Sequence, residues 1–272
     1  MTRIAPGAVC HLRKREEAVS TEKIASGGQF AQRYERKFFI VPKNISFAHT
    51  LLRQICRPDS SYPGGLINSL YFDTPDLDEY NKSSSGDFRK AKVRIRWYDR
   101  IEDYQGMIPV YLELKSREGF ASSKRRERFL VPAQNLEVEH LSAGIIPKST
   151  LIDTLAGFGH FPRQPLQPLI VISYWRYRFT EMMTGVRVCL DYGIRSTFIA
   201  HQMGYGERDL QLRGGVIEVK GPTWDLPITL RHMKLLDTDW TRFSKFSHCI
   251  EAHFSYPGTT ARLWPSGRFA IT

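Results

Sequence analysis

The stretch that decides the fold reads KVRIRWYDR (92–100), VYLELKSREGF (110–120) and SSKRRER (122–128). Each segment carries charge on alternate residues, which is typical of β-strands because side chains i and i+2 of a strand point to one face. In the first segment, one face is basic and the opposite face is apolar. The basic face holds Lys92, Arg94 and Arg96, and the apolar face holds Val93, Ile95 and Trp97. The alternation therefore predicts a strand with two chemically different faces.

The next two segments repeat this arrangement. Glu113 and Lys115 share a face of the second segment, and Lys124, Arg126 and Arg128 share a face of the third. A half-buried strand commonly turns its polar face to water, so a solvated face is one interpretation. Because the basic alternation returns later in the chain, we favour the other interpretation, in which these faces converge on a polyanion.

The composition of the chain agrees with an anionic partner. The 272 residues contain 39 Lys+Arg and 28 Asp+Glu, with a formal net charge of +11 and a pI of about 9.6. This excess indicates a nucleic acid, a membrane surface or a phosphate-rich small molecule. A nucleic-acid binder needs basic and aromatic side chains together on one exposed surface. Here they mostly fall on opposite strand faces, so we expect no nucleic-acid partner.

Cysteine spacing and hydropathy indicate the compartment. The four cysteines (Cys10, Cys56, Cys189 and Cys249) are widely spaced, which favours reduced thiols. No apolar run approaches the roughly 20 residues that a membrane span needs, and the N-terminus lacks the apolar core of a secretory signal. We expect a soluble, cytoplasmic protein without a transmembrane segment.

The order of the elements indicates an α+β fold. We expect about eight strands, including 32–41, 67–73, 169–180, 185–191 and 215–220, and no alternation of strand, helix and strand. Helices are expected at 44–56, 76–82, 132–158 in two pieces, 227–236 and within 242–253. This order favours an antiparallel sheet with flanking helices. We expect one domain over residues 30–257, between a disordered N-terminal tail (1–29) and a C-terminal tail (258–272).

Closure of eight strands into a β-barrel would explain the charge pattern. In a barrel, alternate side chains face the interior and the exterior. The apolar positions would then pack outward on helices, and the charged positions would line the interior. A charged interior is costly unless water or counter-charge occupies it. We therefore expect an anionic ligand inside the barrel.

Several motifs in this order resemble the VTC domain, the polyphosphate polymerase domain of vacuolar transporter chaperone proteins, in the triphosphate tunnel (CYTH-like) superfamily. The motifs include RYERKFFIVP, LYFDTPDLDEY, RIRWY, YLELKSREG, SYWRYRF, VIEVK and FSKF. The resemblance covers Arg33 to His253. It implies an eight-stranded antiparallel tunnel that binds the triphosphate of a nucleotide and a growing polyphosphate chain.

The resemblance implies roles for the matched residues. The expected catalytic residues, which would grip the transferred phosphates, are Arg94, Arg96, Arg176 and Lys245. Glu218 would hold the divalent cation, Mn²⁺ or Mg²⁺, and Glu113 could assist through a metal-bound water. The expected phosphate-binding residues are Lys37, Lys115, Lys124, Arg126, Tyr174, Arg187, Lys220, Arg242 and Ser244. Two simpler interpretations stay open: Glu218 as the ion-pair partner of a lysine, and Tyr174 as a packing residue.

The chain departs from the wider superfamily in its first strand. Hydrolases of the superfamily commonly begin with ExExK, whereas this chain has Arg33-x-Glu35-x-Lys37. The missing glutamate removes one candidate metal carboxylate and argues mildly against a hydrolase. The transmembrane and regulatory domains of the vacuolar complex are also missing, so we expect a stand-alone domain.

The chemistry of phosphoryl transfer suits this set of residues. It needs in-line positioning and neutralisation of phosphate charge more than covalent help from the protein. Arginine supplies bidentate contacts to phosphate, and lysine supplies a point charge. No residue is an obvious nucleophile, so we expect direct attack by a terminal phosphate oxygen of the acceptor. The leading hypothesis is an ATP–polyphosphate phosphotransferase; a metal-dependent triphosphatase and a non-enzymatic polyphosphate-binding module stay open.

Overall fold

The computed structural model describes residues 34–99, 106–119, 121–200, 209–238, 243–255, 262–263 and 269–270. Two residues used in the sequence comparison, Arg33 and Arg242, lie outside the described residues. The expected N-terminal tail, 1–29, lies outside them as well.

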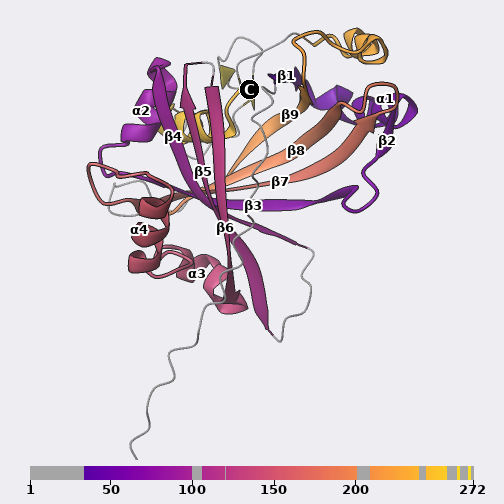
Figure 1. The fold of residues 1–272 in the computed structure, drawn as a ribbon. Coiled ribbons are helices and arrows are strands. Elements are labelled where there is room, and N and C mark those ends of the chain that lie inside the picture. Colours follow the sequence, from indigo (N-terminus) through magenta and orange to yellow (C-terminus); the bar gives the residue numbers. More distant parts are fainter. Residues whose placement is uncertain are drawn as a thin grey trace, which may run out of the picture.

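Eight long strands form one antiparallel sheet at the centre of the molecule (Figure 1). In chain order they are β1 (Tyr34–Ile40), β3 (Gly64–Asp73), β4 (Arg89–Tyr98), β5 (Met107–Glu118), β6 (Ala121–Pro132), β7 (Gln167–Glu181), β8 (Arg187–Phe198) and β9 (Asp209–Gly221). Across the sheet the order is β1-β9-β8-β7-β3-β4-β5-β6, and neighbours in this order are antiparallel. The predicted α+β class with an antiparallel sheet is confirmed.

Three short strands extend this sheet. They are β2 (Cys56–Pro58), β10 (Arg262–Leu263) and β11 (Phe269–Ala270). Strand β10 pairs in parallel with β9, with Arg262 opposite Arg213, and β11 pairs with β10. The stretch expected as a C-terminal tail therefore contains residues that pair with the sheet.

The expected closed barrel needs one correction. Strands β1 and β6 end the eight-strand order, and no backbone pairing joins them in the described part of the chain. Barrel closure requires strand tilt and stagger that match the number of strands, and the pairing of this sheet among the described residues leaves its two edge strands unjoined. Ion pairs bridge the opening instead, since Glu35 on β1 lies 3.4 Å from Lys115 on β5. The sheet is therefore a curled, incompletely closed barrel.

Irregular pairing helps this sheet to curl. Figure 1 shows β4–β6 and β7–β9 as two groups that cross at a steep angle, and β3 pairs with both groups. The register shifts between Tyr71 and Phe72 on β3, between Ser173 and Trp175 on β7, and between Tyr192 and Ile194 on β8. Such bulges bend a strand and increase its twist. The result is one convex and one concave face.

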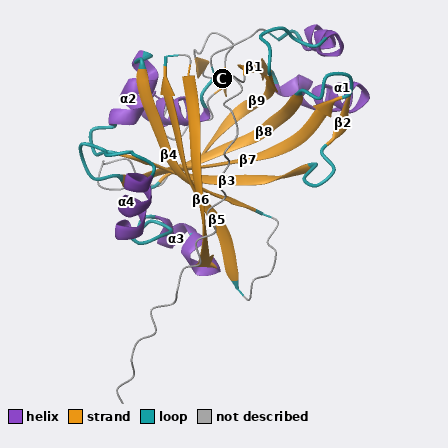
Figure 2. Ribbon diagram, in the orientation of Figure 1, coloured by secondary structure: helices purple, strands orange, loops and turns teal. Residues whose placement is uncertain are grey.

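Helices cover the apolar outer face of β3–β6, as the alternation predicts (Figure 2). The covering elements are η2 (Ala133–Leu136), α3 (Val138–Leu141) and α4 (Lys148–Gly157). Val93 and Ile95 are fully buried in this cluster together with Leu151 and Leu155 of α4. The apolar face of the first decisive segment therefore packs outward, and its basic face is left for the interior.

A second layer covers β1, β8 and β9. It consists of α1 (Ile45–Ile55) and η4 (Ile228–Leu236), which share a buried cluster with these strands. Asn44 precedes α1 as expected, but its side chain does not cap the helix and donates instead to the carbonyl of Leu236, at 3.0 Å. The helix expected at 227–236 is a 3-10 helix.

Helix α5 (Lys245–Ser255) packs on the concave side of the sheet beside α2 (Asp78–Ser85). Phe246, Cys249 and Ile250 of α5 are buried with Ile172 of β7 and Phe198 of β8. On β7 the residues Ile172, Tyr174 and Arg176 share one face, so this face turns from apolar under α5 to polar just beyond the helix start. That boundary positions the functional site.

Candidate functional site

Cationic side chains from six strands and from the first residue of α5 lie close together on the concave side of the sheet. They are Lys37 (β1), Lys92, Arg94 and Arg96 (β4), Lys115 (β5), Lys124 and Arg126 (β6), Arg176 (β7), Lys220 (β9) and Lys245 (α5). The carboxylates among them are Glu35, Glu113, Asp191 and Glu218. Because the cations outnumber the carboxylates, the site carries a positive excess that an anionic ligand can neutralise.

Glu113 is the centre of the first ion-pair group. The strand register places it opposite Arg94 on β4 and Arg126 on β6. Its carboxylate lies 2.6 Å from Arg94, 2.6 Å from Lys124, 3.4 Å from Arg126 and 4.0 Å from Arg96. Burial opposes its charge, but Arg94, Arg96 and Lys124 outweigh burial and lower the pKa of Glu113. Glu113 therefore serves as an anchor for cations, and its contacts do not suit the expected metal role.

Asp191 is the centre of the second group. This side chain on β8 is fully buried and accepts two hydrogen bonds from Arg176, at 2.6 and 2.7 Å, and one from Lys245, at 2.5 Å. Arg176 also donates to Glu218, at 2.9 Å. Burial opposes the charge of Asp191, but Arg176 and Lys245 outweigh it and lower the pKa of that carboxyl group. Asp191 thus orients two of the expected catalytic residues.

Glu35 ties three strands together at the opening of the sheet. Its carboxylate lies 3.0 Å from Lys37, 3.4 Å from Lys115 on β5 and 3.9 Å from Lys220 on β9. Lys220 also contacts Glu218, at 3.1 Å. These contacts join the Glu35 and Asp191 groups into one network that spans both edges of the curled sheet.

Tyr174 connects the Glu113 and Asp191 groups. Its hydroxyl accepts a hydrogen bond from Arg96, at 3.3 Å, and its ring lies 4.5 Å from the ammonium of Lys245 and 5.4 Å from the guanidinium of Arg176. Burial favours the neutral phenol, but Arg176, Arg96 and Lys245 outweigh it and lower the pKa of Tyr174. Tyr174 therefore contacts three of the cations in addition to packing in the core.

Residues 243–245 lead into α5 and face the same cations. Lys37 donates to the carbonyl of Phe243, at 2.9 Å, and Lys92 donates to the Ser244 hydroxyl, at 2.7 Å. Ser244 Oγ also accepts from the backbone N–H of Ser247, at 3.3 Å, which fixes it at the helix start. The segment therefore presents oxygen atoms to two strand lysines.

The structure brings together most of the residues expected from the sequence. Arg187 is an exception: it shares a face of β8 with Asp191, but it is exposed at the strand's first position, opposite Lys220. Arg242 lies outside the described residues. Asp191 was not predicted as a site residue, although it ends the strand predicted at 185–191. Lys92 was also left out of the predicted site, although it has the same alternation as Arg94 and Arg96.

The carboxylates suited to a divalent cation lie around Glu218. Glu218 is buried, its carboxyl group is a hydrogen-bonding neighbour of Glu35, and it lies close enough to Asp191 to influence that group's charge. Burial opposes its charge, but Lys220 and Arg176 outweigh burial and lower the pKa of Glu218. No group of three His, Cys, Asp or Glu side chains suited to a metal occurs among the described residues. One or two carboxylates still fit Mg²⁺ or Mn²⁺, because such ions take the rest of their ligands from water and phosphate oxygens.

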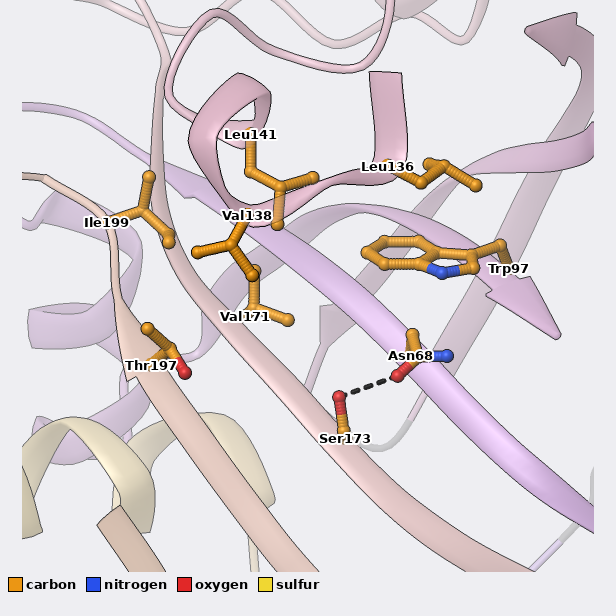
Figure 3. A pocket seen from close by; sticks show the side chains of 9 residues that line it. All are labelled: Asn68, Trp97, Leu136, Val138, Leu141, Val171, Ser173, Thr197 and Ile199. Atoms are coloured by element: carbon orange, nitrogen blue, oxygen red, sulfur yellow. Dashed lines mark hydrogen bonds between the residues drawn. The ribbon is translucent and has the colours of Figure 1, made fainter. Parts of the chain in front are cut away.

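A separate pocket lies outside this network. Figure 3 shows it between the sheet and the η2–α3 segment, lined by apolar side chains such as Trp97 and Leu141 and by the hydrogen-bonded pair Asn68 and Ser173. Its lining contains no lysine or arginine. Trp97 alternates with Arg96 on β4, so the pocket opens on the outer face of the sheet.

No helix of the described residues is long and apolar enough to cross a membrane.

The sequence of this chain matches a known protein family. A protein-family profile described as the VTC domain matches residues 32–254. A search of curated proteins gives no match.

Among solved structures, the chain is similar to a candidate adenylyl cyclase from Hippeastrum, reported to have a dominant triphosphatase activity, with 17% identity and a TM-score of 0.47 over 80% of this chain and 95% of that one. It is also similar to a candidate adenylate cyclase from Bacillus halodurans, with 17% identity and a TM-score of 0.45 over 78% and 95% of the two chains.

Proposed function

The chain belongs to the VTC domain family, and on this premise we propose that it is a polyphosphate polymerase. It transfers the terminal phosphoryl group of a nucleoside triphosphate, ATP, to a growing polyphosphate chain. The observation that carries the proposal is the convergence of cations from six strands and α5 on one concave face, where they outnumber the carboxylates.

Four of these cations would grip the transferred phosphates. They are Arg94, Arg96, Arg176 and Lys245. Carboxylates already hold three of them in place: Arg94 contacts Glu113, and Asp191 accepts a bidentate contact from Arg176 and a further hydrogen bond from Lys245. Such preorganised donors stabilise charge on phosphate oxygens without reorganising during the reaction. The remaining cations, Lys37, Lys92, Lys115, Lys124, Arg126 and Lys220, would line the path of the chain.

Glu218, with Glu35 beside it, would hold the divalent cation. When bound, Mn²⁺ or Mg²⁺ supplies positive charge to the oxygens of the triphosphate. Tyr174 and Ser244 would add neutral hydrogen-bond donors near the transferred group, since their hydroxyls lie beside Arg96 and Lys92.

The carboxylates of the site are poorly suited to activate water, which favours a phosphate nucleophile when an acceptor is bound. A hydrolase must deprotonate water, for which a general base with a pKa near the working pH is best suited. The pKa values of Glu113, Asp191 and Glu218 are instead lowered, because neighbouring cations outweigh the burial that opposes their charge. A terminal phosphate oxygen is already anionic and needs no base. The nucleophile in this proposal is therefore the acceptor phosphate.

One assay separates the possible activities. Purified protein is incubated with ATP, Mn²⁺ and a short polyphosphate, and chain length and free phosphate are measured in the same sample. The proposal predicts longer chains, with one ADP formed for each phosphate added. Release of phosphate without chain growth would identify a triphosphatase, and binding without either product would identify a binding module.

A matched pair of variants tests the role of the concave face. Arg94→Gln removes a cation held by Glu113, whereas Arg125→Gln removes an exposed cation from the opposite face of β6. We expect Arg94→Gln to slow chain growth by roughly 100-fold or more, as for loss of a preorganised charge-stabilising donor. Arg125→Gln should elongate chains at the wild-type rate, and equal losses in both variants would argue against a site on this face.

A further inference from the structure

The Ser244 hydroxyl has a neighbour that the other hydroxyls of the site lack. The hydroxyls of Ser69, Tyr71 and Tyr174 each accept a hydrogen bond from an arginine, at 3.1, 3.0 and 3.3 Å. Ser244 Oγ instead lies 2.7 Å from the amine of Lys92. A guanidinium stays protonated, whereas a lysine amine can lose its proton when its surroundings disfavour the charge. Serine and lysine are thus arranged as a nucleophile beside a base.

The surroundings of Lys92 disfavour its charge. The groups that face it are Lys90 and Arg94 of β4, Lys37 of β1, Lys115 of β5, Ser244 just before α5, and the Phe246 ring and His248 of α5. Burial and then the like charges of Lys37, Lys115, Lys90 and Arg94 lower the pKa of Lys92 to about 7. A large fraction of its amine is therefore neutral near neutral pH and can accept the proton of the adjacent hydroxyl.

Ser244 also lies where a bound phosphoryl group would be held. The next residue is Lys245, one of the four gripping cations, and Lys37 contacts the carbonyl of the preceding Phe243. A hydroxyl among these cations lies beside the path proposed for the polyphosphate chain. The position can also hold a phosphate once attached, because three lysine ammonium groups surround it and α5 begins there.

We propose that Ser244 accepts the terminal phosphoryl group of the bound nucleoside triphosphate and that the resulting phosphoserine is a built-in primer for the first chain. In this step Ser244 Oγ forms a bond to the γ-phosphorus, and the bond between that phosphorus and the β,γ-bridging oxygen breaks. The electron pair leaves with the nucleoside diphosphate, and the hydroxyl proton passes to Lys92 Nζ. The inference rests on the proposed binding of a nucleoside triphosphate in this site. It extends the proposed reaction to conditions in which no phosphate acceptor is present.

The test uses the full chain with γ-³²P-ATP and Mn²⁺ and no added acceptor. After denaturation, label on the protein is quantified and mapped by mass spectrometry, while soluble polyphosphate is measured in a parallel sample with a short polyphosphate primer. We expect acid-stable label on Ser244. We also expect the labelling rate at saturating ATP to increase from pH 6 to pH 9, because bound phosphate raises the pKa of Lys92 and each rise in pH leaves more of its amine neutral. Ser244→Ala should carry no such label, and Ser244→Thr should restore part of it.

A further variant distinguishes proton acceptance by Lys92 from the effect of its positive charge, and a second variant serves as the control. Lys92→Arg keeps the positive charge but cannot accept a proton, and we expect it to label Ser244 roughly 100-fold more slowly, the range for loss of a general base. Ser83→Ala is the matched control, because Ser83 is linked to Ser244 only through Ser247, in hydrogen bonds of 3.1 and 3.2 Å. It should label as the wild type does.

The outcomes distinguish this inference from the proposed function. Chain growth from added primer without phosphate on Ser244 would overturn the inference and leave the polymerase in place. Phosphoserine at Ser244 without chain growth would support the transfer to Ser244, but it would overturn both its role as a primer and the polymerase. Acid-labile label on lysine, or label on a different serine, would overturn the inference, and absence of every product would overturn both.

Discussion

Asp191 is the single residue on which the geometry of the gripping cations depends most. It is fully buried, and it balances both Arg176 and Lys245 at hydrogen-bond distance. Asp191→Asn would keep its shape and remove its charge. Lys245 would lose its carboxylate partner, and Arg176 would keep only Glu218. We expect the free energy of unfolding to fall by about 3–5 kcal/mol, the usual cost of breaking a buried ion pair. Urea unfolding measures this loss.

The same variant should respond more strongly to ligand. Inorganic tripolyphosphate can replace the lost negative charge beside Arg176 and Lys245, so we expect it to recover more stability in Asp191→Asn than in the wild type. Asp153→Asn, at an exposed position of α4, is the control and should change stability by less than about 0.5 kcal/mol. Equal stabilisation of variant and wild type by tripolyphosphate would mean that the ligand binds away from these two cations.

Two lysines of the site give binding a defined pH dependence. Burial lowers the pKa of Lys92 to about 7, with help from Lys37 and Lys115, and it lowers the pKa of Lys124 to about 8 against the attraction of Glu113. An anionic ligand favours the charged amines and raises both pKa values. Tripolyphosphate affinity should therefore fall as pH rises from 7 to 9, and binding at pH 8 should take up protons. Calorimetry in buffers with different ionisation enthalpies measures this uptake.

The free energy of unfolding of the unliganded protein should instead increase with pH. The folded-state pKa values of Lys92 and Lys124 lie below the ordinary value of 10.5. The unfolded chain thus binds more protons than the folded chain between about pH 7 and 10, and these two groups make stability increase with pH over that range. Lys92→Met should reduce both the proton uptake on binding and this increase. Proton release on binding would contradict the assignment.

At the scale of single strands, the features that depend on neighbouring residues were the ones that the sequence predicted best. The period of two separates Arg94 and Arg96 from Val93 and Ile95 within a few residues, and the structure places the first pair in the ion-pair network and the second in the outer core. The partners of these side chains were not predictable in this way. Glu113 meets Arg94 and Arg126 only because the register of two hairpins aligns them, and register depends on contacts across the sheet.

Strand lengths were underestimated for a related reason. The prediction ended a strand at Asp191, whereas β8 continues to Phe198. Gly193 adopts a left-handed conformation, with φ of +61°, at the register shift between Tyr192 and Ile194. A bulge of this kind keeps the strand in the sheet while bending it. From the sequence alone, this glycine resembles a strand terminator.

Helix α5 links the core to the site, and its first buried residue offers a test. Phe246 is 2% exposed and stacks on Tyr71 at 4.9 Å, and the Tyr71 hydroxyl accepts from Arg94. Phe246→Ala should cost about 3–5 kcal/mol of stability, as for other buried Phe to Ala changes. It should also slow chain growth, because Lys245 and Tyr71 lose their common support.

An exposed residue of another helix controls for general effects of side-chain truncation. Ile152 of α4 is 63% exposed, so Ile152→Ala should leave unfolding within about 0.5 kcal/mol of the wild type. Thermal and urea unfolding of both variants, combined with the chain-growth assay, separates core packing from site geometry. A Phe246→Ala protein with wild-type activity would mean that α5 does not position the gripping cations.

At the scale of the whole molecule, the concave face is the feature that joins fold and function. Its formation follows from the alternation of apolar and basic residues, since the apolar faces find helices and the basic faces are left facing each other. How far the sheet closes was not predictable, because closure depends on bulges and on the register between strands that are distant in the sequence. The structure leaves the edges bridged by ion pairs such as Glu35 with Lys115.

The central claim is that this concave face binds one chain of condensed phosphate, and a crystal structure with tripolyphosphate and Mn²⁺ tests it most directly. We predict density for a single phosphate chain between Arg94 and Arg96 on one side and Arg176 and Lys245 on the other. A chain bound on the outer face of β6 beside Arg125, with the concave face empty of phosphate, would contradict the account.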